Sequence, residues 1–140
     1  MLVLDTDHVT EYQRGTSAEA HRLKQRLDLA TESYATTIVT VEEIVRGWMA
    51  AIHRVREPRR QINAYARLQQ LFRFFATWNV LQWSETAADR YDSLRRAKIR
   101  IGTMDLKIAS ITLATDATLL TRNTTDFRRI PSLRVEDWLS

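Results

Sequence analysis

Cysteine is absent from this 140-residue sequence, and glycine and proline are scarce, with three and two copies respectively. Without cysteine the chain forms neither disulfides nor a thiolate zinc site, so a reducing compartment, by default the cytoplasm, is the expected location. The amino terminus has no basic region before an apolar run, and no apolar run approaches the roughly 20 residues that a membrane-spanning helix needs. We therefore expect neither secretion nor membrane insertion.

Hydrophobic residues make up 44% of the chain, enough for a core without disulfides or structural metals. We find no internal repeat, low-complexity tract or linker, so residues 1–140 are expected to form one domain. The net charge of +4 and the pI of about 9.8 bias the surface toward polyanions such as nucleic acids. Because 17 acidic residues lie among 21 basic ones, charge alone does not establish that partner.

Short apolar runs alternate with segments in which apolar residues recur every three or four positions. The runs predict strands at Leu2–Leu4, Tyr34–Val39, Asn79–Trp83, Thr118–Thr121 and Leu133–Val135. The periodic segments predict helices at Ala18–Leu29, Val41–His53, Gln61–Ala76, Ala87–Ile99 and Leu106–Ala114, with breaks near Pro58 and Gly102. The alternation predicts a three-layer α/β/α domain with a mostly parallel central sheet of about five strands.

Certain acids follow the predicted strands or begin the predicted helices. Asp5 ends the first strand and Asp7 lies two residues later, while Glu43 is expected in the first turn of the helix after the second strand. Asp105 opens the helix before the fourth strand, and Asp126 follows that strand. In a parallel α/β fold these positions share one edge of the sheet, so the acids are expected to converge.

Each acid also has a purely structural explanation, because carboxylates near a helix amino terminus typically gain about 0.3–1 kcal/mol. Residues Thr40–Glu43 could form a capping box, and Asn123–Asp126 could form a cap with an acid three positions later. Convergence favours a second explanation, since neighbouring carboxylates raise one another's pKa unless a cation neutralises them. Mg²⁺ and Mn²⁺ prefer such hard oxygen ligands.

The histidines do not supply a zinc signature. His8, His21 and His53 lack the paired spacing of zinc ligands, and each is expected to be a surface or capping residue. The predicted site is therefore a carboxylate cluster for Mg²⁺ or Mn²⁺, chemistry that suits hydrolysis of a phosphodiester.

Four segments together resemble the PIN-domain nucleases, and specifically the VapC-type toxins of bacterial toxin–antitoxin pairs. They are LDTDHV at 4–9, TTIVTVEEIVRG at 36–47, IGTMDLKIAS at 101–110 and LLTRNTTDF at 119–127. The resemblance implies an endoribonuclease that uses Mg²⁺ or Mn²⁺ and leaves a 5′-phosphate and a 3′-hydroxyl. It also implies a homodimer neutralised by a small VapB-like antitoxin. The family's metal-binding and catalytic acids fall on Asp5, Glu43, Asp105 and Asp126.

Two positions depart from the family pattern. Asp7 stands where such toxins often have asparagine, and Arg122 stands where many have a small polar residue. Asp7 could be a fifth acid of the site or could cap the following helix.

Further polar residues lie beside the four acids. Thr6, Thr121 and Asn123 could orient ligands or phosphate, or could be turn and cap residues. Arg46 follows Glu43 by three positions and could contact a phosphate, or could pair with an acid one turn away.

Basic and aromatic clusters complete the pattern. The basic clusters, which could steer a polyanion or simply be solvated, are Arg54, Arg56, Arg59 and Arg60, and then Arg95, Arg96, Lys98 and Arg100. The aromatic residues follow helical spacing and are expected in the core, or in a groove for a partner helix: Trp48, Phe72, Phe74, Phe75 and Trp78.

Two other functions are compatible with the same fold. The chain could be a non-catalytic RNA-binding module, although such a module has no reason to keep four mutually repelling acids. It could also be a DNA nuclease or a general RNA-processing enzyme, because a fold does not determine a substrate.

Overall fold

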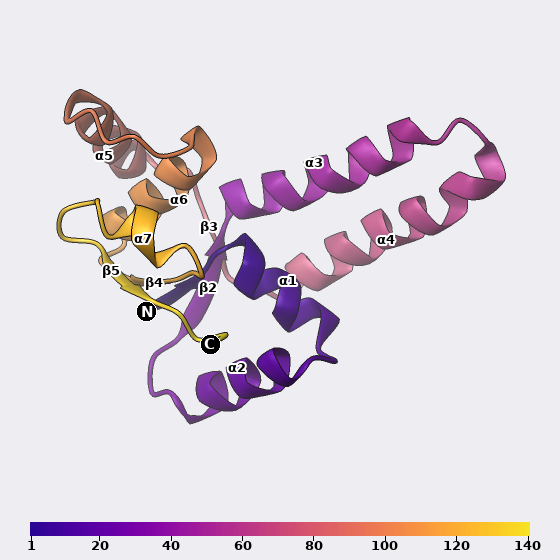
Figure 1. Cartoon of the computed structure of the whole chain (residues 1–140), viewed down its shortest axis with the longest axis horizontal. Coiled ribbons are helices and arrows are strands. Elements are labelled where there is room, and N and C mark those ends of the chain that lie inside the picture. The colour runs from indigo at the N-terminus through magenta and orange to yellow at the C-terminus, as the bar shows by residue number, and fades with distance from the viewer.

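A computed structural model describes residues 1–140 and contains five strands and seven helices (Figure 1). The strands are β1 (Leu2–Leu4), β2 (Tyr34–Thr37), β3 (Val80–Leu81), β4 (Thr118–Leu120) and β5 (Arg134–Glu136). The helices are α1 (Thr6–Arg14), α2 (Ala18–Leu29), α3 (Ile38–Arg54), α4 (Pro58–Ala76), α5 (Glu85–Arg96), α6 (Thr103–Ala114) and α7 (Thr124–Phe127). None of these helices has both the length and the apolar character needed to cross a membrane.

The five strands form one sheet in the order β3-β2-β1-β4-β5, and every pairing is parallel. Strand β1 lies at the centre, with Leu2 opposite Tyr34 of β2 and Thr118 of β4. The chain builds outward from β1 through β2 and β3, then returns to its other side to add β4 and β5. Such a reversal leaves a crevice at the carboxyl ends of the two strands that flank it, here β1 and β4.

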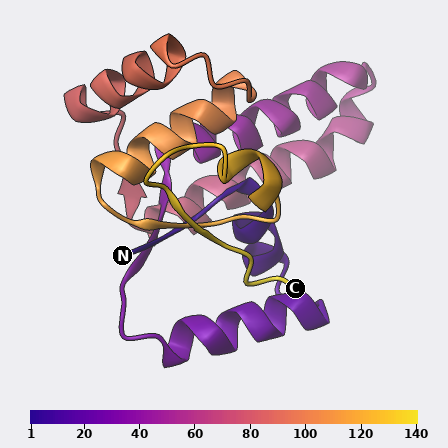
Figure 2. The same ribbon diagram turned by 60° about the vertical axis from the view of Figure 1, so that its left-hand side comes forward.

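The two faces of the sheet carry separate hydrophobic clusters, because successive strand side chains point to opposite faces. Val3 and Leu119 pack with residues of α5, α6 and α7. Leu2, Leu4 and Leu120 pack with residues of α1, α2 and α4. Figures 1 and 2 show α5 and α6 on one side of the sheet and α1 and α2 on the other. The predicted three-layer α/β/α architecture is confirmed.

Helices α3 and α4 form a long hairpin that projects from the body of the molecule (Figure 1). Pro58, the predicted break, begins α4, and the turn is closed by Gln61, whose Nε2 donates to the carbonyls of Ile52 and Val55 at 3.2 and 2.7 Å. The basic residues Arg54, Arg56, Arg59 and Arg60 are all exposed at this turn.

The predicted aromatic residues divide among three environments. Phe75 is buried in the α1–α2–α4 cluster, and Phe74 and Trp78 pack against it. Trp78 makes edge-on contacts with the rings of Tyr12 and Tyr34, at centroid distances of 5.0 and 5.5 Å. Phe72, by contrast, is 59% exposed. Phe72 therefore lies outside the core, and the interface role that was the alternative for it stays a prediction.

The second strand is shorter than predicted, because Thr37 ends it and caps α3. The Thr37 hydroxyl accepts a hydrogen bond from the Thr40 backbone N–H at 3.0 Å, so α3 begins at Ile38 rather than Val41. The predicted capping box at Thr40–Glu43 is therefore wrong, and Glu43 lies in the second turn rather than the first. The β-branched run from Thr36 to Thr40 favours a strand, but the cap overrides that local preference.

Helix α1 was not predicted. It spans only nine residues and buries only His8 and Val9, so it contains few apolar residues from which a helix can be recognised. Its ends are set by caps: Asp5 accepts from the His8 backbone N–H, and Gly15 adopts a φ of 68° that favours glycine.

Candidate active site

The elements that meet at the β1–β4 crevice carry all four predicted acids. Asp5 directly follows β1, and its backbone N–H donates to the Leu120 carbonyl of β4 at 3.0 Å. Asp105 and Asp126 are each the third residue of a helix, α6 and α7. Asp5 is buried, with 7% of its surface exposed, while the other three are partly buried.

The electrostatics of Asp105 show that the acids share one neighbourhood. The pKa of Asp105 is raised from its ordinary value of 3.8 to about 6, first by burial and then by the negative charges of Glu43, Asp5, Asp126 and Asp7, in this order. A carboxylate close to four others is costly to ionise unless a cation is present. The structure therefore brings Asp5, Glu43 and Asp126 together around Asp105.

Hydrogen bonds fix the orientation of two of these acids. Thr6 donates from Oγ1 to Oε1 of Glu43 at 2.7 Å, and Asn123 donates from Nδ2 to Oδ2 of Asp126 at 3.0 Å. Thr121 is fully buried, and its hydroxyl accepts from the Asn123 backbone N–H at 3.0 Å. The Asn123 side chain makes no backbone cap, so its contact is with the acid of α7.

The cluster suits a hydrated divalent cation better than a fully dehydrated one. No three histidine, aspartate or glutamate side chains are placed to hold an ion directly. Mg²⁺ usually keeps several waters and needs only one or two carboxylates together with substrate phosphate. The donors available here are hard carboxylate oxygens whose mutual repulsion a cation would relieve, so the residues fit Mg²⁺ or Mn²⁺ in chemical type.

Asp7 lies near the cluster, whereas Arg46 pairs with an acid of its own helix. Asp7 is an exposed residue in the first turn of α1, and because Asp5 is the cap, the capping role predicted for Asp7 is wrong. Incomplete solvation and the charge of Asp5 raise the pKa of Asp7, while Arg122 opposes that increase. Arg46 pairs with Glu42 one turn away, at 2.6 Å between Nη2 and Oε2, so the predicted ion pair is confirmed.

His8 departs most from the sequence-based expectation. His21 and His53 are exposed as predicted, but His8 is completely buried. Its Nδ1 lies 3.2 Å from Oδ1 of Asp5, and its Nε2 accepts from the Trp138 backbone N–H at 3.2 Å. When Asp5 caps a helix, the residue three positions later lies next to the Asp5 side chain. The spacing of His8 from Asp5 was therefore the sequence signal for this contact.

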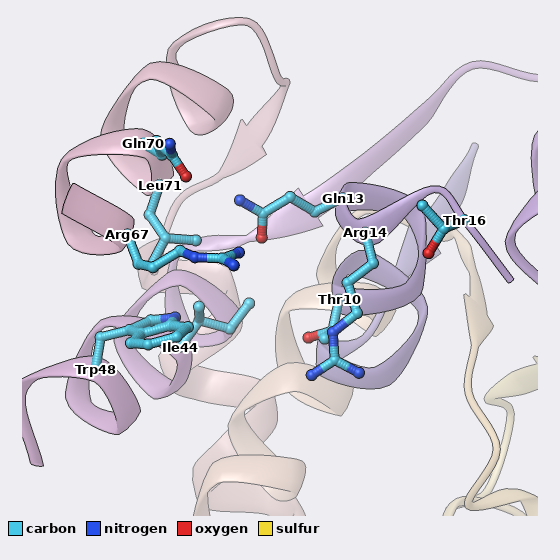
Figure 3. A pocket seen from close by; sticks show the side chains of 9 residues that line it. All are labelled: Thr10, Gln13, Arg14, Thr16, Ile44, Trp48, Arg67, Gln70 and Leu71. Carbon is cyan, nitrogen blue, oxygen red and sulfur yellow. The ribbon is translucent and has the colours of Figure 1, made fainter. Parts of the chain in front are cut away.

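A cavity of about 490 Å³ lies between α1, α3 and α4 and is separate from the acids. Figure 3 shows Ile44 and Trp48 of α3 beside Leu71 and Arg67 of α4, with Arg14 of α1 opposite. Its remaining lining residues are polar: Thr10, Gln13, Thr16 and Gln70. Of the five aromatic residues predicted to lie in the core or in a groove, only Trp48 lines this cavity.

The fold and the site together define a parallel α/β domain with carboxylates gathered where the strand order reverses. The family model described as PIN domain matches residues 2–133. The chain belongs to the PIN domain family, which confirms the predicted resemblance.

The individual proteins that resemble this chain share only part of its sequence. The chain is similar to Ribonuclease VapC2 of Rickettsia felis, with 36% identity over 69 residues that cover 46% of this chain and about half, 52%, of that protein. Among solved structures it resembles a chain of VapBC2 from Rickettsia felis bound to a promoter DNA fragment, with 23% identity, a TM-score of 0.71 and 98% of each chain covered.

Two further structures extend this fold similarity. The DNA-bound VapBC from Salmonella typhimurium gives 23% identity and a TM-score of 0.73, with 98% of this chain and 97% of that chain covered. A toxin–antitoxin complex from Klebsiella pneumoniae gives 22% identity and a TM-score of 0.69, with 99% and 98% covered. At these identities the structures show that the fold is shared.

Proposed function

We propose that this chain is a metal-dependent endoribonuclease toxin of the VapC type. The observation that carries the proposal is the gathering of Asp5, Glu43 and Asp126 around Asp105, whose pKa reaches about 6 in the absence of a counter-ion. Membership of the PIN domain family and the similarity to Ribonuclease VapC2 support the same conclusion. Perturbed carboxylates in a crevice are typical of catalytic sites.

Asp5, Glu43, Asp105 and Asp126 would hold one or two Mg²⁺ or Mn²⁺ ions, directly or through bound water. When bound, such an ion activates water at neutral pH and neutralises charge on the phosphate. The reaction is in-line hydrolysis, in which water oxygen bonds to phosphorus and the bond from phosphorus to O3′ breaks. The products carry a 5′-phosphate and a 3′-hydroxyl, and no protein nucleophile is needed.

The remaining residues of the site position the acids. Thr6 restrains the Glu43 carboxylate and Asn123 restrains that of Asp126, so two of the four acids are oriented before substrate arrives. The exposed arginines at the α3–α4 turn provide a positive surface that would attract the RNA backbone. A second exposed basic cluster spans the end of α5 and the residues after it, at Arg95, Arg96, Lys98 and Arg100.

The partner would be a small VapB-like antitoxin, and the active species would be a homodimer. The α1–α3–α4 cavity supports this proposal, because its hydrophobic lining residues Ile44, Trp48 and Leu71 suit a peptide segment inserted between helices. Similar folds occur in structures described as VapBC and as a toxin–antitoxin complex. A short reading frame next to the gene would identify the partner, and light scattering of the purified protein would measure the oligomeric state.

The test is cleavage of total cellular RNA by the purified full chain with Mg²⁺ or Mn²⁺. The wild type is compared with Asp5→Ala, with Asp105→Ala and with wild type in EDTA. Asp89→Ala is the matched control, because Asp89 is an exposed acid on α5 outside the cluster. We expect discrete cuts by the wild type and the control only.

Other outcomes identify the alternatives. Cleavage that survives both substitutions would contradict the proposed site. Cleavage of DNA at a comparable rate would favour a general nuclease. RNA binding without cleavage by any variant would favour a non-catalytic RNA-binding module.

A further inference from the structure

The imidazole of His8 joins the site to a segment 130 residues away in the sequence. It is completely buried in the α1–α2–α4 side of the molecule, on the first turn of α1. Its Nδ1 lies 3.2 Å from Oδ1 of Asp5, while its Nε2 lies 3.2 Å from the backbone nitrogen of Trp138. One ring therefore contacts both a predicted metal-binding acid and the segment that follows β5.

The partners determine which ring nitrogen carries the proton. A backbone N–H can only donate, so the contact with Trp138 requires an unprotonated Nε2. The ring proton then resides on Nδ1, where it is donated to the Asp5 carboxylate. These two hydrogen bonds run in the same direction, from Trp138 through the ring to Asp5, and the Asp137 carboxylate lies farther from Nε2, at 3.8 Å.

Both hydrogen bonds to the Asp5 carboxylate use the same oxygen. Oδ1 accepts from the His8 backbone N–H at 3.0 Å and from the His8 ring. No hydrogen bond to a protein group occupies Oδ2, and this atom is not a fully buried, unpartnered one. The two hydrogen bonds to Oδ1 therefore restrain the rotation of the Asp5 carboxylate. Oδ2 is left as the oxygen available to a cation.

The segment that holds Nε2 is itself firmly placed. Trp138 is 8% exposed, the guanidinium of Arg26 lies 4.2 Å from its ring centroid, and its indole N–H donates to Glu136 at 2.6 Å. Leu139 is 2% exposed in the same hydrophobic cluster as Leu4. A buried ring between two fixed hydrogen-bond partners has little freedom to rotate.

We propose that His8 is a positioning residue that orients Asp5 toward a divalent cation. The inference rests on the proposed function for the presence of a cation at Asp5. Partners that orient metal ligands typically change metal affinity by about 10- to 100-fold when they are removed. His8 touches neither the substrate nor the cation in this role, so its effect is exerted through Asp5.

Two substitutions distinguish the hydrogen bond made by Nδ1 from the one made by Nε2. His8→Asn places an amide near the position of Nδ1 and can still donate to Asp5, but it lacks a group at Nε2. His8→Gln reaches the position of Nε2 and can accept from Trp138, but it lacks the donor to Asp5. Leu139→Ala is the control for destabilisation, because Leu139 is buried in the hydrophobic cluster on this side of the sheet and is not a partner in the His8–Asp5 hydrogen bond.

The measurement is Mn²⁺ binding to the purified full chain, followed by electron paramagnetic resonance of free Mn²⁺, with Tm recorded for every variant. We expect His8→Gln to weaken binding about tenfold or more and His8→Asn to stay within about threefold of the wild type. Leu139→Ala should lower Tm without changing Mn²⁺ affinity. Equal losses in both His8 variants, no loss in either, or a matching loss in Leu139→Ala would overturn the inference.

A measurement on the wild type keeps the test independent of variant folding. Nuclear magnetic resonance of the ¹⁵N-labelled chain should show His8 protonated at Nδ1 only, with its ring signals shifting as Mg²⁺ is added. Protonation at Nε2, or signals that ignore Mg²⁺, would overturn the inference. If the wild type binds no Mn²⁺ at all, both this inference and the metal dependence of the proposed function fail. If Mn²⁺ binds equally well to the wild type and the His8 variants, only this inference fails.

Discussion

Thr6 and Glu43, which are 37 positions apart, are joined by a 2.7 Å hydrogen bond from the Thr6 hydroxyl to Oε1 of the carboxylate. Thr6 is the first residue of α1 and Glu43 lies in the second turn of α3, so the bond links the two helices that follow β1 and β2. It holds the Glu43 side chain toward the acid cluster without using a basic residue, and so leaves the negative charge of the cluster undiminished.

Replacing Thr6 with valine keeps the shape of the side chain and removes the hydroxyl. We expect Thr6→Val to reduce RNA cleavage by about 10-fold or more, because an unrestrained Glu43 would no longer be preoriented. Thr6→Ser should retain most of the activity, since it keeps the donor. The comparison is made from initial cleavage rates at saturating Mn²⁺, and equal rates for the valine and serine variants would contradict the role of this bond.

Asp105 should make stability fall as pH rises. Its pKa is about 6 in the folded protein against an ordinary value of 3.8, so between these pH values the folded protein binds more protons than the unfolded chain. The contribution of Asp105 to the stability of the folded state is fully present below pH 3.8 and is lost as pH rises through about 6. At pH 7.5 without metal, Asp105→Asn should therefore raise the free energy of unfolding, on the order of 1 kcal/mol after solvent screening.

The same substitution should abolish cleavage, so stability and activity change in opposite directions. Urea unfolding of wild type and Asp105→Asn at pH 4 and pH 7.5 provides the measurement. The advantage of the asparagine variant should be larger at pH 7.5. A wild type that is equally or more stable than the variant at pH 7.5 would show that Asp105 does not experience the repulsion described.

Divalent metal should stabilise the folded chain, because binding to the folded state alone shifts the unfolding equilibrium. At a free metal concentration of 100 times Kd the expected gain is about 2.7 kcal/mol. Calorimetry with Mg²⁺ and then with excess EDTA should show a reversible increase in Tm for the wild type. Asp5→Asn serves as the comparison, and an equal increase in that variant would place the bound metal elsewhere.

Arg46 should be dispensable for cleavage. Its ion pair with Glu42 is exposed, with 69% of the arginine side chain accessible, and exposed pairs contribute roughly 0–1 kcal/mol. We expect Arg46→Ala to change the free energy of unfolding by less than about 0.5 kcal/mol and the cleavage rate by less than about threefold. A large loss of RNA cleavage with unchanged Tm would instead reveal a phosphate contact.

Much of the architecture follows from the sequence because each strand is a short apolar run between periodic helical segments. The buried strand β1 and the helix α2 were predicted with their observed bounds. The errors lie where a single cap decides the outcome. Thr37 turns a β-branched run into a helix, and Asp5 begins a short helix with few apolar residues.

The identity of the clustered acids was predictable for a similar reason. The carboxyl ends of parallel strands share an edge, so Asp5 and Asp126 had to lie near one another once the sheet was parallel. The contacts that orient these acids were not predictable. His8 contacts a backbone nitrogen 130 positions away, and Thr6 contacts Glu43 across 37 positions, distances over which no local pattern extends.

The central place of β1 has a consequence for synthesis on the ribosome. Its first neighbour, β2, is complete by residue 37, but its second neighbour, β4, begins only at residue 118. While residues 38–117 are being translated, the strand that precedes Asp5 keeps one edge without its partner. Exposed strand edges pair readily with other chains, and pairing between distant segments is slow. In a nascent chain of this topology, the central strand is therefore enclosed only after the α-helical hairpin and the helices that follow it have been synthesised.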